Sequence, residues 1–251
     1  MTRRPPPLLV LAVLGLAGLV LADAVRGPSA PAEPSSQPAI QPPGRASAGA
    51  RPPAMAPGAA SRAAVRERLL TFGPGTYFDS LLSISDSVIR RWDDAHDVIH
   101  FAFVHDEPEG WHPALADEVR LVLRQWAPVP IRFEEAPDTA AADVVFSWVP
   151  QFGIRRAGQT DLFWDGYGTL YRARVTLALR SELGQPLPRA ARMAVAMHEV
   201  GHVLGLPHSA DSADVMYEAT RVESPSPRDR RTLRLLYDLP VGLVREPRER
   251  R

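Results

Sequence analysis

The segment from His198 to His208 limits the fold and the chemistry of this chain more than any other stretch, and its sequence is HEVGHVLGLPH. His198 and His202 are four residues apart. On an α-helix both side chains would therefore lie on one face, with Cβ atoms about 5–6 Å apart. Imidazole nitrogens at that spacing can bind a single metal ion at about 2.0–2.1 Å. The spacing predicts a helix that carries two ligands of one metal site.

The neighbouring residues complete the predicted site. Glu199 lies roughly 100° round the helix from His198, beside the ion rather than on it. Gly205 can adopt a positive φ, so the helix can end there and the chain can bring His208 back to the same ion. Three neutral imidazoles leave a fourth position for water, which is typical of catalytic zinc. We predict one catalytic Zn²⁺ bound by His198, His202 and His208, with Glu199 as the general base.

This segment resembles the extended zinc signature of the metzincin metallopeptidases, and Met216 stands where that clan has its Met-turn. Ser209 after the third histidine, and Tyr217 after Met216, are most similar to the matrixin (matrix metalloproteinase-like) branch. In the astacin-like and serralysin-like branches an extra tyrosine ligand falls two residues after the methionine, and this chain has Glu218 there. In layout the resemblance covers roughly residues 86–239.

The resemblance implies an α+β fold of the metzincin-like zincin type. Such a fold has a twisted, mixed five-stranded sheet with an antiparallel edge strand, two long helices, and a small C-terminal subdomain with the Met-turn and a final helix. Met216 would form a hydrophobic floor beneath the metal site. The implied activity is that of a zinc endopeptidase, which hydrolyses peptide bonds through a zinc-activated water with Glu199 as general base. Its partner would be a peptide or protein substrate, and we expect a monomer.

Hydrophobic patterning predicts the main elements of the domain. Val98–Val104 is nearly continuously apolar and is typical of a buried strand. Pro113–Trp126 has the stripe of an amphipathic helix, and Ile131–Glu135 and Asp143–Val149 are predicted strands. Strand, helix and two strands with short links indicate a crossover and parallel sheet members. Pro188–Leu204 is predicted as the helix that carries the metal site.

A hairpin is predicted where Gln159–Asp165 and Thr169–Leu179 flank the turn Gly-Tyr-Gly. The resemblance implies that the first arm, about residues 157–165, is the edge strand over the active-site cleft. An unpaired edge could hold an extended peptide through main-chain hydrogen bonds. An ordinary edge hairpin with no part in substrate binding is the alternative. The candidate substrate-binding residues are Gln159, Thr160, Asp161, Leu162 and Phe163.

Helices are also predicted at both ends of the domain. Ala63–Leu70 favours a short helix, followed by a turn at residues 72–76. Ser226-Pro-Arg-Asp229 is typical of a capping box that opens a last helix, and Pro240 ends it.

Composition excludes several functions. The formal net charge is zero, so nothing in the charge favours binding to nucleic acid or to an anionic membrane. There is no cysteine, so the propeptide thiolate that keeps the animal matrixins latent has no counterpart here. Animal matrixins also bind a structural zinc through His and Asp residues in the region that corresponds to residues 149–179. This chain has no histidine between Val149 and Leu179, so we predict no structural zinc and leave calcium binding open.

The start of the chain predicts export. Two arginines precede an apolar run from Leu8 to Ala22, and Ala-Asp-Ala ends at Ala24, which is the pattern of a cleaved signal peptide over residues 1–24. An uncleaved anchor is the alternative, although a spanning helix needs about 20 apolar residues, and the paired arginines also admit a twin-arginine signal. The protein is therefore expected to be extracytoplasmic, either secreted or tethered to the membrane by an uncleaved leader.

The rest of the chain divides by composition into three further segments. Residues 25–60 are rich in Pro and Ala and predict a disordered linker, with a propeptide as the alternative. Residues 61–240 are assigned to the metallopeptidase catalytic domain, and residues 241–251 to an Arg-rich tail.

Two rival functions are compatible with the motif. One is a catalytically inactive zinc-binding or adhesion module, against which the presence of Glu199 argues. The other is a zinc hydrolase that acts on a non-protein polymer of the cell envelope.

Overall fold

The protein is described by a computed structural model that covers residues 59–85, 88–127, 131–153 and 156–243. The predicted leader over residues 1–24, and nearly all of the linker predicted over residues 25–60, lie outside this part of the chain. Within the described residues no helix combines the length and the apolar character that crossing a membrane requires.

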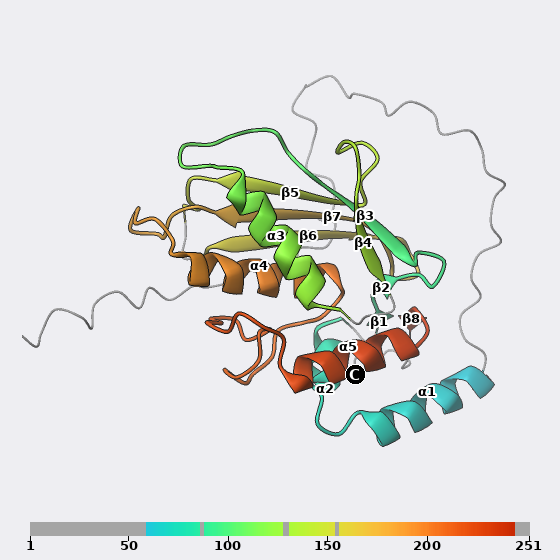
Figure 1. Ribbon diagram of the computed structural model, residues 1–251. Coiled ribbons are helices and arrows are strands. Elements are labelled where there is room, and N and C mark those ends of the chain that lie inside the picture. Colours follow the sequence, from blue (N-terminus) through green and yellow to red (C-terminus); the bar gives the residue numbers. More distant parts are fainter. Residues whose placement is uncertain (1–58, 86–87, 128–130, 154–155, 244–251) are drawn as a thin grey trace, which may run out of the picture.

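The centre of the structure is a mixed β-sheet (Figure 1). Its strands are β2 (Arg91–Trp92), β3 (Val98–Phe103), β4 (Arg132–Glu135), β5 (Val144–Val149), β6 (Gly158–Trp164) and β7 (Thr169–Ala178). The five longer strands lie in the order β6, β7, β5, β3, β4, all parallel except β6, which is antiparallel to β7. This confirms the predicted mixed sheet with its antiparallel edge strand. The two-residue strand β2 lies parallel to the start of β7 and is an addition to the five predicted strands.

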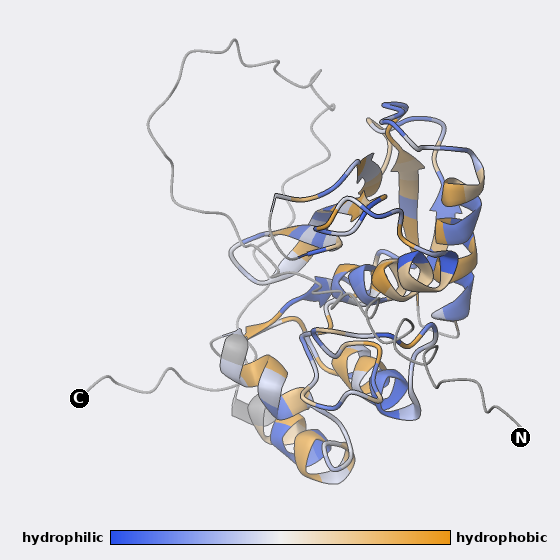
Figure 2. Ribbon diagram, turned by 90° about the vertical axis from the view of Figure 1, so that its left-hand side faces the viewer, coloured by the Kyte–Doolittle hydropathy of each residue, from blue (hydrophilic) through white to orange (hydrophobic). Residues whose placement is uncertain are grey.

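Helices α3 (Ala114–Gln125) and α4 (Arg189–Val203) cover one face of the sheet (Figure 1). Below α4 lie α1 (Ala59–Phe72), α2 (Phe78–Ile84) and α5 (Pro227–Asp238), together with the small antiparallel pair β1 (Val88–Ile89) and β8 (Gly242–Leu243). In Figure 2 both the strands and the helices carry hydrophobic as well as hydrophilic stretches. Helix α4 lies between the sheet and the lower helices, and its residues from Met193 to Val203 are all buried.

The predicted stripe on α3 packs as expected. Leu115, Val119 and Leu123 are buried, and so is Trp126 directly after the helix. The indole Nε1 of Trp126 donates a hydrogen bond of 3.1 Å to the main-chain oxygen of Met197 on α4. Because a buried Trp N–H needs an acceptor, this bond fixes the position of the two helices relative to each other.

The segment that contains α1 and α2, before the sheet, contacts the C-terminal part of the fold. The sequence did not predict this contact. Helix α1 is longer than the predicted range of residues 63–70, and α2 was not predicted. Tyr77, immediately before α2, donates its hydroxyl proton to Asp229 Oδ1 on α5 at 2.9 Å. Its main-chain N–H bonds to Thr232 Oγ1 at 3.3 Å, also on α5. The lower subdomain is therefore built from both ends of the domain.

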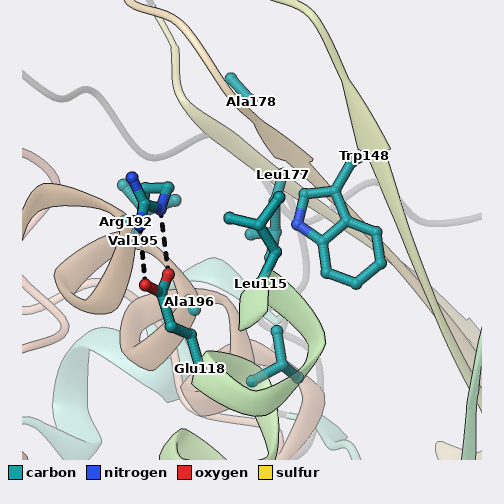
Figure 3. A pocket seen from close by; sticks show the side chains of 9 residues that line it. Leu115, Glu118, Trp148, Leu177, Ala178, Arg192, Val195 and Ala196 are labelled. Carbon is teal, nitrogen blue, oxygen red and sulfur yellow. Dashed lines mark hydrogen bonds and ion pairs between the residues drawn. The ribbon is translucent and has the colours of Figure 1, made fainter. Parts of the chain in front are cut away.

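A partly buried ion pair joins α3 to the first turn of α4 (Figure 3). The guanidinium of Arg192 donates from Nε and Nη2 to the two carboxylate oxygens of Glu118, at 2.9 and 2.7 Å. Arg192 also donates to the main-chain oxygen of Leu187 at 2.6 Å. The pair lines a small pocket between the two helices and the sheet, next to Leu115 and Trp148.

Replacing Glu118 by Ala should lower the free energy of unfolding by about 2 kcal/mol, because the Arg192 charge would keep its place between the helices without its two-point partner. Urea unfolding followed by circular dichroism measures the change. Asp117→Ala on the same helix is the control. Asp117 forms an ion pair with Arg120, and the Asp117 side chain is solvent-exposed. Loss of this ion pair should lower the free energy of unfolding by less than about 1 kcal/mol. Equal effects of the two substitutions would contradict the structural role of the Glu118–Arg192 pair.

Candidate metal centre

The metal-site helix ends at a glycine, as the sequence predicts. Gly205 has a φ of 95°, and its N–H donates to the His202 oxygen at 2.8 Å, while Leu206 N–H donates to the Gly201 oxygen at 3.0 Å. These two bonds and the left-handed glycine form a Schellman motif. A Cβ at Gly205 would lie 2.6 Å from the main-chain oxygen of Arg90, so a larger residue does not fit. The chain consequently leaves α4 in a direction that brings His208 back towards the helix.

The structure brings His198, His202 and His208 together. Each ring contributes one nitrogen to a group of three nitrogens that all lie within 4.8 Å of one another. The ring centroids are 4.7 Å apart for His198 and His202, 5.1 Å for His198 and His208, and 4.9 Å for His202 and His208. His198 and His202 are fully buried, and His208 is half-buried.

Hydrogen bonds determine which nitrogen of each helix histidine is free. His198 Nδ1 lies 2.8 Å from the main-chain oxygen of Val215, and His202 Nδ1 lies 2.8 Å from that of Leu206. A carbonyl oxygen only accepts, so Nδ1 carries the proton in both rings and Nε2 keeps its lone pair. The Nε2 atoms of all three histidines are buried and have no hydrogen-bond partner among the residues that the structure describes. Three convergent, unpaired imidazole nitrogens are the donor set that zinc prefers, so these residues fit a zinc ion.

The electrostatic environment keeps these rings neutral. Burial, and to a lesser extent His208, lower the pKa of His198 to about 3. Burial, followed by the two neighbouring histidines, places the pKa of His202 far below its usual value, and burial lowers the pKa of His208 as well. Neutral imidazoles are the form that binds a metal, so the protein need not remove protons before it does so near neutral pH.

Glu199 is fully buried next to the three histidines. Burial raises the pKa of its carboxyl to about 8, although a hydrogen bond from Thr160 works in the opposite direction. Its Oε1 atom is buried, and within the described ranges it has no hydrogen-bond partner. An unpaired carboxylate oxygen at this place is able to accept a proton from a neighbouring water, as the predicted general base must.

Met216 is fully buried against the metal-site helix, a position compatible with the predicted floor of the site. Its side chain packs against Gly201 on α4, where a Cβ would overlap the Met216 sulfur and lie 3.0 Å from Cζ2 of Trp126. Only a glycine lets the methionine approach the helix this closely.

Gly201→Ala should therefore destabilise the protein by about 1–3 kcal/mol through overpacking, despite the better helix propensity of alanine. It should also weaken zinc binding, because Met216 adjoins Val215, whose carbonyl orients His198. Thermal unfolding and zinc competition against a chelator measure the two effects. Gly153→Ala is the control, since no atom lies within 4 Å of a Cβ built there. A variant Gly201→Ala with unchanged melting temperature and unchanged zinc affinity would contradict this packing.

The buried carboxylate of Asp214 anchors the segment after His208. No motif in the sequence indicated this residue. Asp214 is 2% exposed and accepts hydrogen bonds from Ser226 Oγ at 2.6 Å and from Arg228 Nε at 2.7 Å. It also accepts from the hydroxyl of Ser209, the residue next to His208. Burial raises its pKa, but these hydrogen bonds outweigh burial and the net pKa lies below the usual value. Asp214 therefore ties the third histidine's segment to the start of α5.

A second carboxylate, that of Asp229, forms a hydrogen bond with the segment of the Met-turn. Asp229 is fully buried and accepts a hydrogen bond of 2.9 Å from the Val215 N–H. The carbonyl of Val215 in turn accepts from His198. Asp229 also completes the capping box with Ser226 that the sequence predicts at the start of α5. The cap of the last helix and the orientation of the first histidine thus share one residue.

Strand β6 contains the five residues predicted at the substrate edge. Thr160 and Leu162 are buried, so their side chains are not open to a substrate. Gln159, Asp161 and Phe163 alternate with them and are half-buried. In the described part of the chain β6 pairs with β7 alone, which leaves its other edge without a strand partner.

The match to a protein family agrees with this geometry. The family model of the matrixins matches residues 188–238, which extend from the start of α4 to the end of α5 and include all three histidines. Among solved structures, that of myroilysin is similar with a TM-score of 0.40 and 12% sequence identity, over 61% of this chain and 99% of the other. No curated protein matches the chain.

The matched segment and the mixed sheet support a matrixin-like metzincin. The match and the three clustered histidines support a zinc metallopeptidase in general. The individual roles of the site residues stay predictions.

Proposed function

We propose that the protein is a zinc endopeptidase that acts outside the cytoplasm. The observation that carries this proposal is a set of four buried, unpaired acceptor atoms in one site, namely the Nε2 atoms of the three histidines and Oε1 of Glu199. Buried polar atoms without a partner are rare in folded proteins and call for a specific explanation. Binding of a metal ion and of a water molecule satisfies all four.

In this proposal His198, His202 and His208 would hold the zinc through Nε2. Bound there, zinc would polarise the scissile carbonyl and lower the pKa of a water molecule towards about 7. Glu199 accepts a proton at Oε1 from the water that attacks the carbonyl carbon. Glu199 then delivers that proton to the nitrogen of the scissile bond as the C–N bond breaks, so that the leaving group departs as an amine. The carbonyls of Val215 and Leu206 keep two of the rings in the required orientation throughout.

The edge of β6 that has no strand partner in the described part of the chain supports a peptide as the substrate. An extended peptide could add to this edge through main-chain hydrogen bonds, antiparallel or parallel to the strand. Because Thr160 and Leu162 are buried, the edge would contact a peptide with its main chain and with the half-buried side chains of Gln159, Asp161 and Phe163.

The proposal is tested by incubating the purified protein with a peptide library and with purified cell-wall polymer, each with and without a metal chelator. We expect internal cleavage of peptides that the chelator abolishes and that zinc restores. Hydrolysis of the polymer alone would favour the rival envelope hydrolase. Zinc binding without any hydrolysis would favour the inactive binding module.

The proposed location has its own test. Fractionation of the producing cells, followed by N-terminal sequencing of the mature protein, should find it outside the cytoplasm and beginning at Val25, directly after Ala24. A protein found in the cytoplasm with an intact N-terminus would contradict export.

A further inference from the structure

Strand β6 crosses α4 directly at Glu199. The hydroxyl of Thr160 lies 2.6 Å from Oε2 of Glu199 and 3.2 Å from the main-chain oxygen of the same residue. Thr160 is fully buried, as is Glu199. Two elements that are far apart in the sequence therefore meet through one side chain on each.

The hydrogen bond distinguishes the two carboxylate oxygens of Glu199. Oε2 accepts a hydrogen bond from Thr160, whereas Oε1 has no partner in the part of the chain that the structure describes. A hydroxyl can donate to a charged carboxylate and can also accept from a protonated one. Thr160 can therefore hold Oε2 before and after Glu199 takes up a proton, and hydrogen bonds to charged groups are among the stronger ones in proteins.

Two residues earlier on β6, Gly158 provides the space for this arrangement. A Cβ built on Gly158 would overlap Oε1 of Glu199 and lie 2.7 Å from its Cγ and 2.7 Å from Cγ1 of Val195. A side chain at this position would have to displace the carboxylate or the strand. Gly158 thus leaves the space that the Glu199 carboxylate occupies, and Thr160 holds Oε2 of that carboxylate by a hydrogen bond.

We propose that Thr160 is a positioning residue for the general base, holding Glu199 by Oε2 so that Oε1 stays directed at the reacting water, with Gly158 supplying the room. This inference rests on the proposed function of Glu199. It assigns to Thr160 a role other than contact with substrate, although Thr160 lies in the strand predicted to bind the peptide.

Thr160→Val tests the proposal, because valine keeps the shape of threonine and removes the hydroxyl. With a fluorogenic peptide we expect kcat to fall by about 10–100-fold, as is typical when a group that orients an active-site residue is lost. KM should change little and zinc should still bind in a 1:1 ratio. Thr160→Ser, which restores a hydroxyl, should recover most of the activity.

A crystal structure of the zinc-loaded Thr160→Val protein supplies a readout that does not depend on activity. The Glu199 carboxylate should adopt a different rotamer or more than one. Gly158→Ala should displace it as well and lower kcat. Thr232→Val is the matched control. Thr232 is equally buried, and its hydroxyl donates a hydrogen bond to the main chain of α5. Because Thr232 lies outside the site, its replacement should leave kcat unchanged.

Three kinetic outcomes would overturn the inference. The first is an unchanged kcat in Thr160→Val, and the second is a Thr160→Ser protein as slow as Thr160→Val. The third is a rise in KM alone in Thr160→Val, which would mean that Thr160 contacts the substrate. If the wild type hydrolyses no peptide, the proposed function fails, and the Glu199 rotamer in the Thr160→Val structure decides this inference separately. An unaltered rotamer there would overturn it.

Discussion

Replacing Glu199 by Gln should lower kcat/KM for peptide hydrolysis by about 10²–10⁴-fold, the range that general acid–base catalysis contributes. Glutamine keeps the size of the side chain and can still accept a hydrogen bond from Thr160, but it cannot take up the proton at Oε1. Zinc should bind as in the wild type, because Glu199 is not one of the three proposed ligands. Kinetics on a fluorogenic peptide, with zinc content measured on the same sample, check both parts.

The fold should tolerate this substitution. Burial raises the pKa of Glu199 to about 8, which means that the charged form is disfavoured in the folded protein and a neutral amide carries no such penalty. Glu134→Gln is a suitable control, since Glu134 is exposed on β4 at the far edge of the sheet. Wild-type turnover by Glu199→Gln would show that another group acts as the base.

Removing the third histidine should have the next largest effect. In His208→Ala we expect zinc affinity to fall by more than about 100-fold, because even the loss of a group that only orients a ligand typically lowers affinity by about 10–100-fold. His208 is half-buried and lies outside the helix, so the fold should survive the change. Competition with a chromophoric chelator measures the zinc affinity. At low zinc concentration the variant should also lose peptide hydrolysis, because it no longer binds the metal.

His100→Ala is the matched control for this prediction. His100 lies on β3, with its side chain 48% exposed and Nδ1 3.4 Å from Asp143 Oδ2, far along the chain from the metal-site helix. Its replacement should leave zinc affinity within about twofold of the wild type, as expected for a surface substitution away from the site. If His208→Ala bound zinc as tightly as His100→Ala, the third ligand would have to be another residue.

The sequence was informative where local spacing determines geometry. The interval between His198 and His202 places both on one helical face, and Gly205 ends the helix with a positive φ, as expected. The apolar stripe of α3 and the hairpin of β6 and β7 follow equally from short-range patterns. In each case the relevant neighbours lie within a few residues along the chain.

Contacts between distant segments could not be predicted in this way. Thr160 and Glu199 are 39 residues apart, and a threonine in an alternating strand is equally compatible with ordinary sheet packing. Asp214 meets Arg228 only because α5 folds back under the Met-turn, and either residue alone is typical of a solvated loop or helix start. The strand β2 is two residues long and has no periodicity to detect.

The unpredicted helix α2 has a different explanation. It is seven residues long and has no side-chain cap at its N-terminus, so the usual start signal is missing. Its apolar residues Phe78, Leu81 and Leu82 have helical spacing but extend over little more than one turn. Burial of these residues in the hydrophobic core, rather than local propensity, is what stabilises so short a helix.

The most direct test of the account is a zinc titration of the metal-free protein in which peptide cleavage and bound metal are followed together. We predict that cleavage rises in proportion to bound zinc and reaches its maximum at one equivalent per chain, and that His208→Ala shows neither effect at the same zinc concentrations. Cleavage that persists in the metal-free protein, or zinc that binds tightly without involving the three histidines, would contradict the central claim.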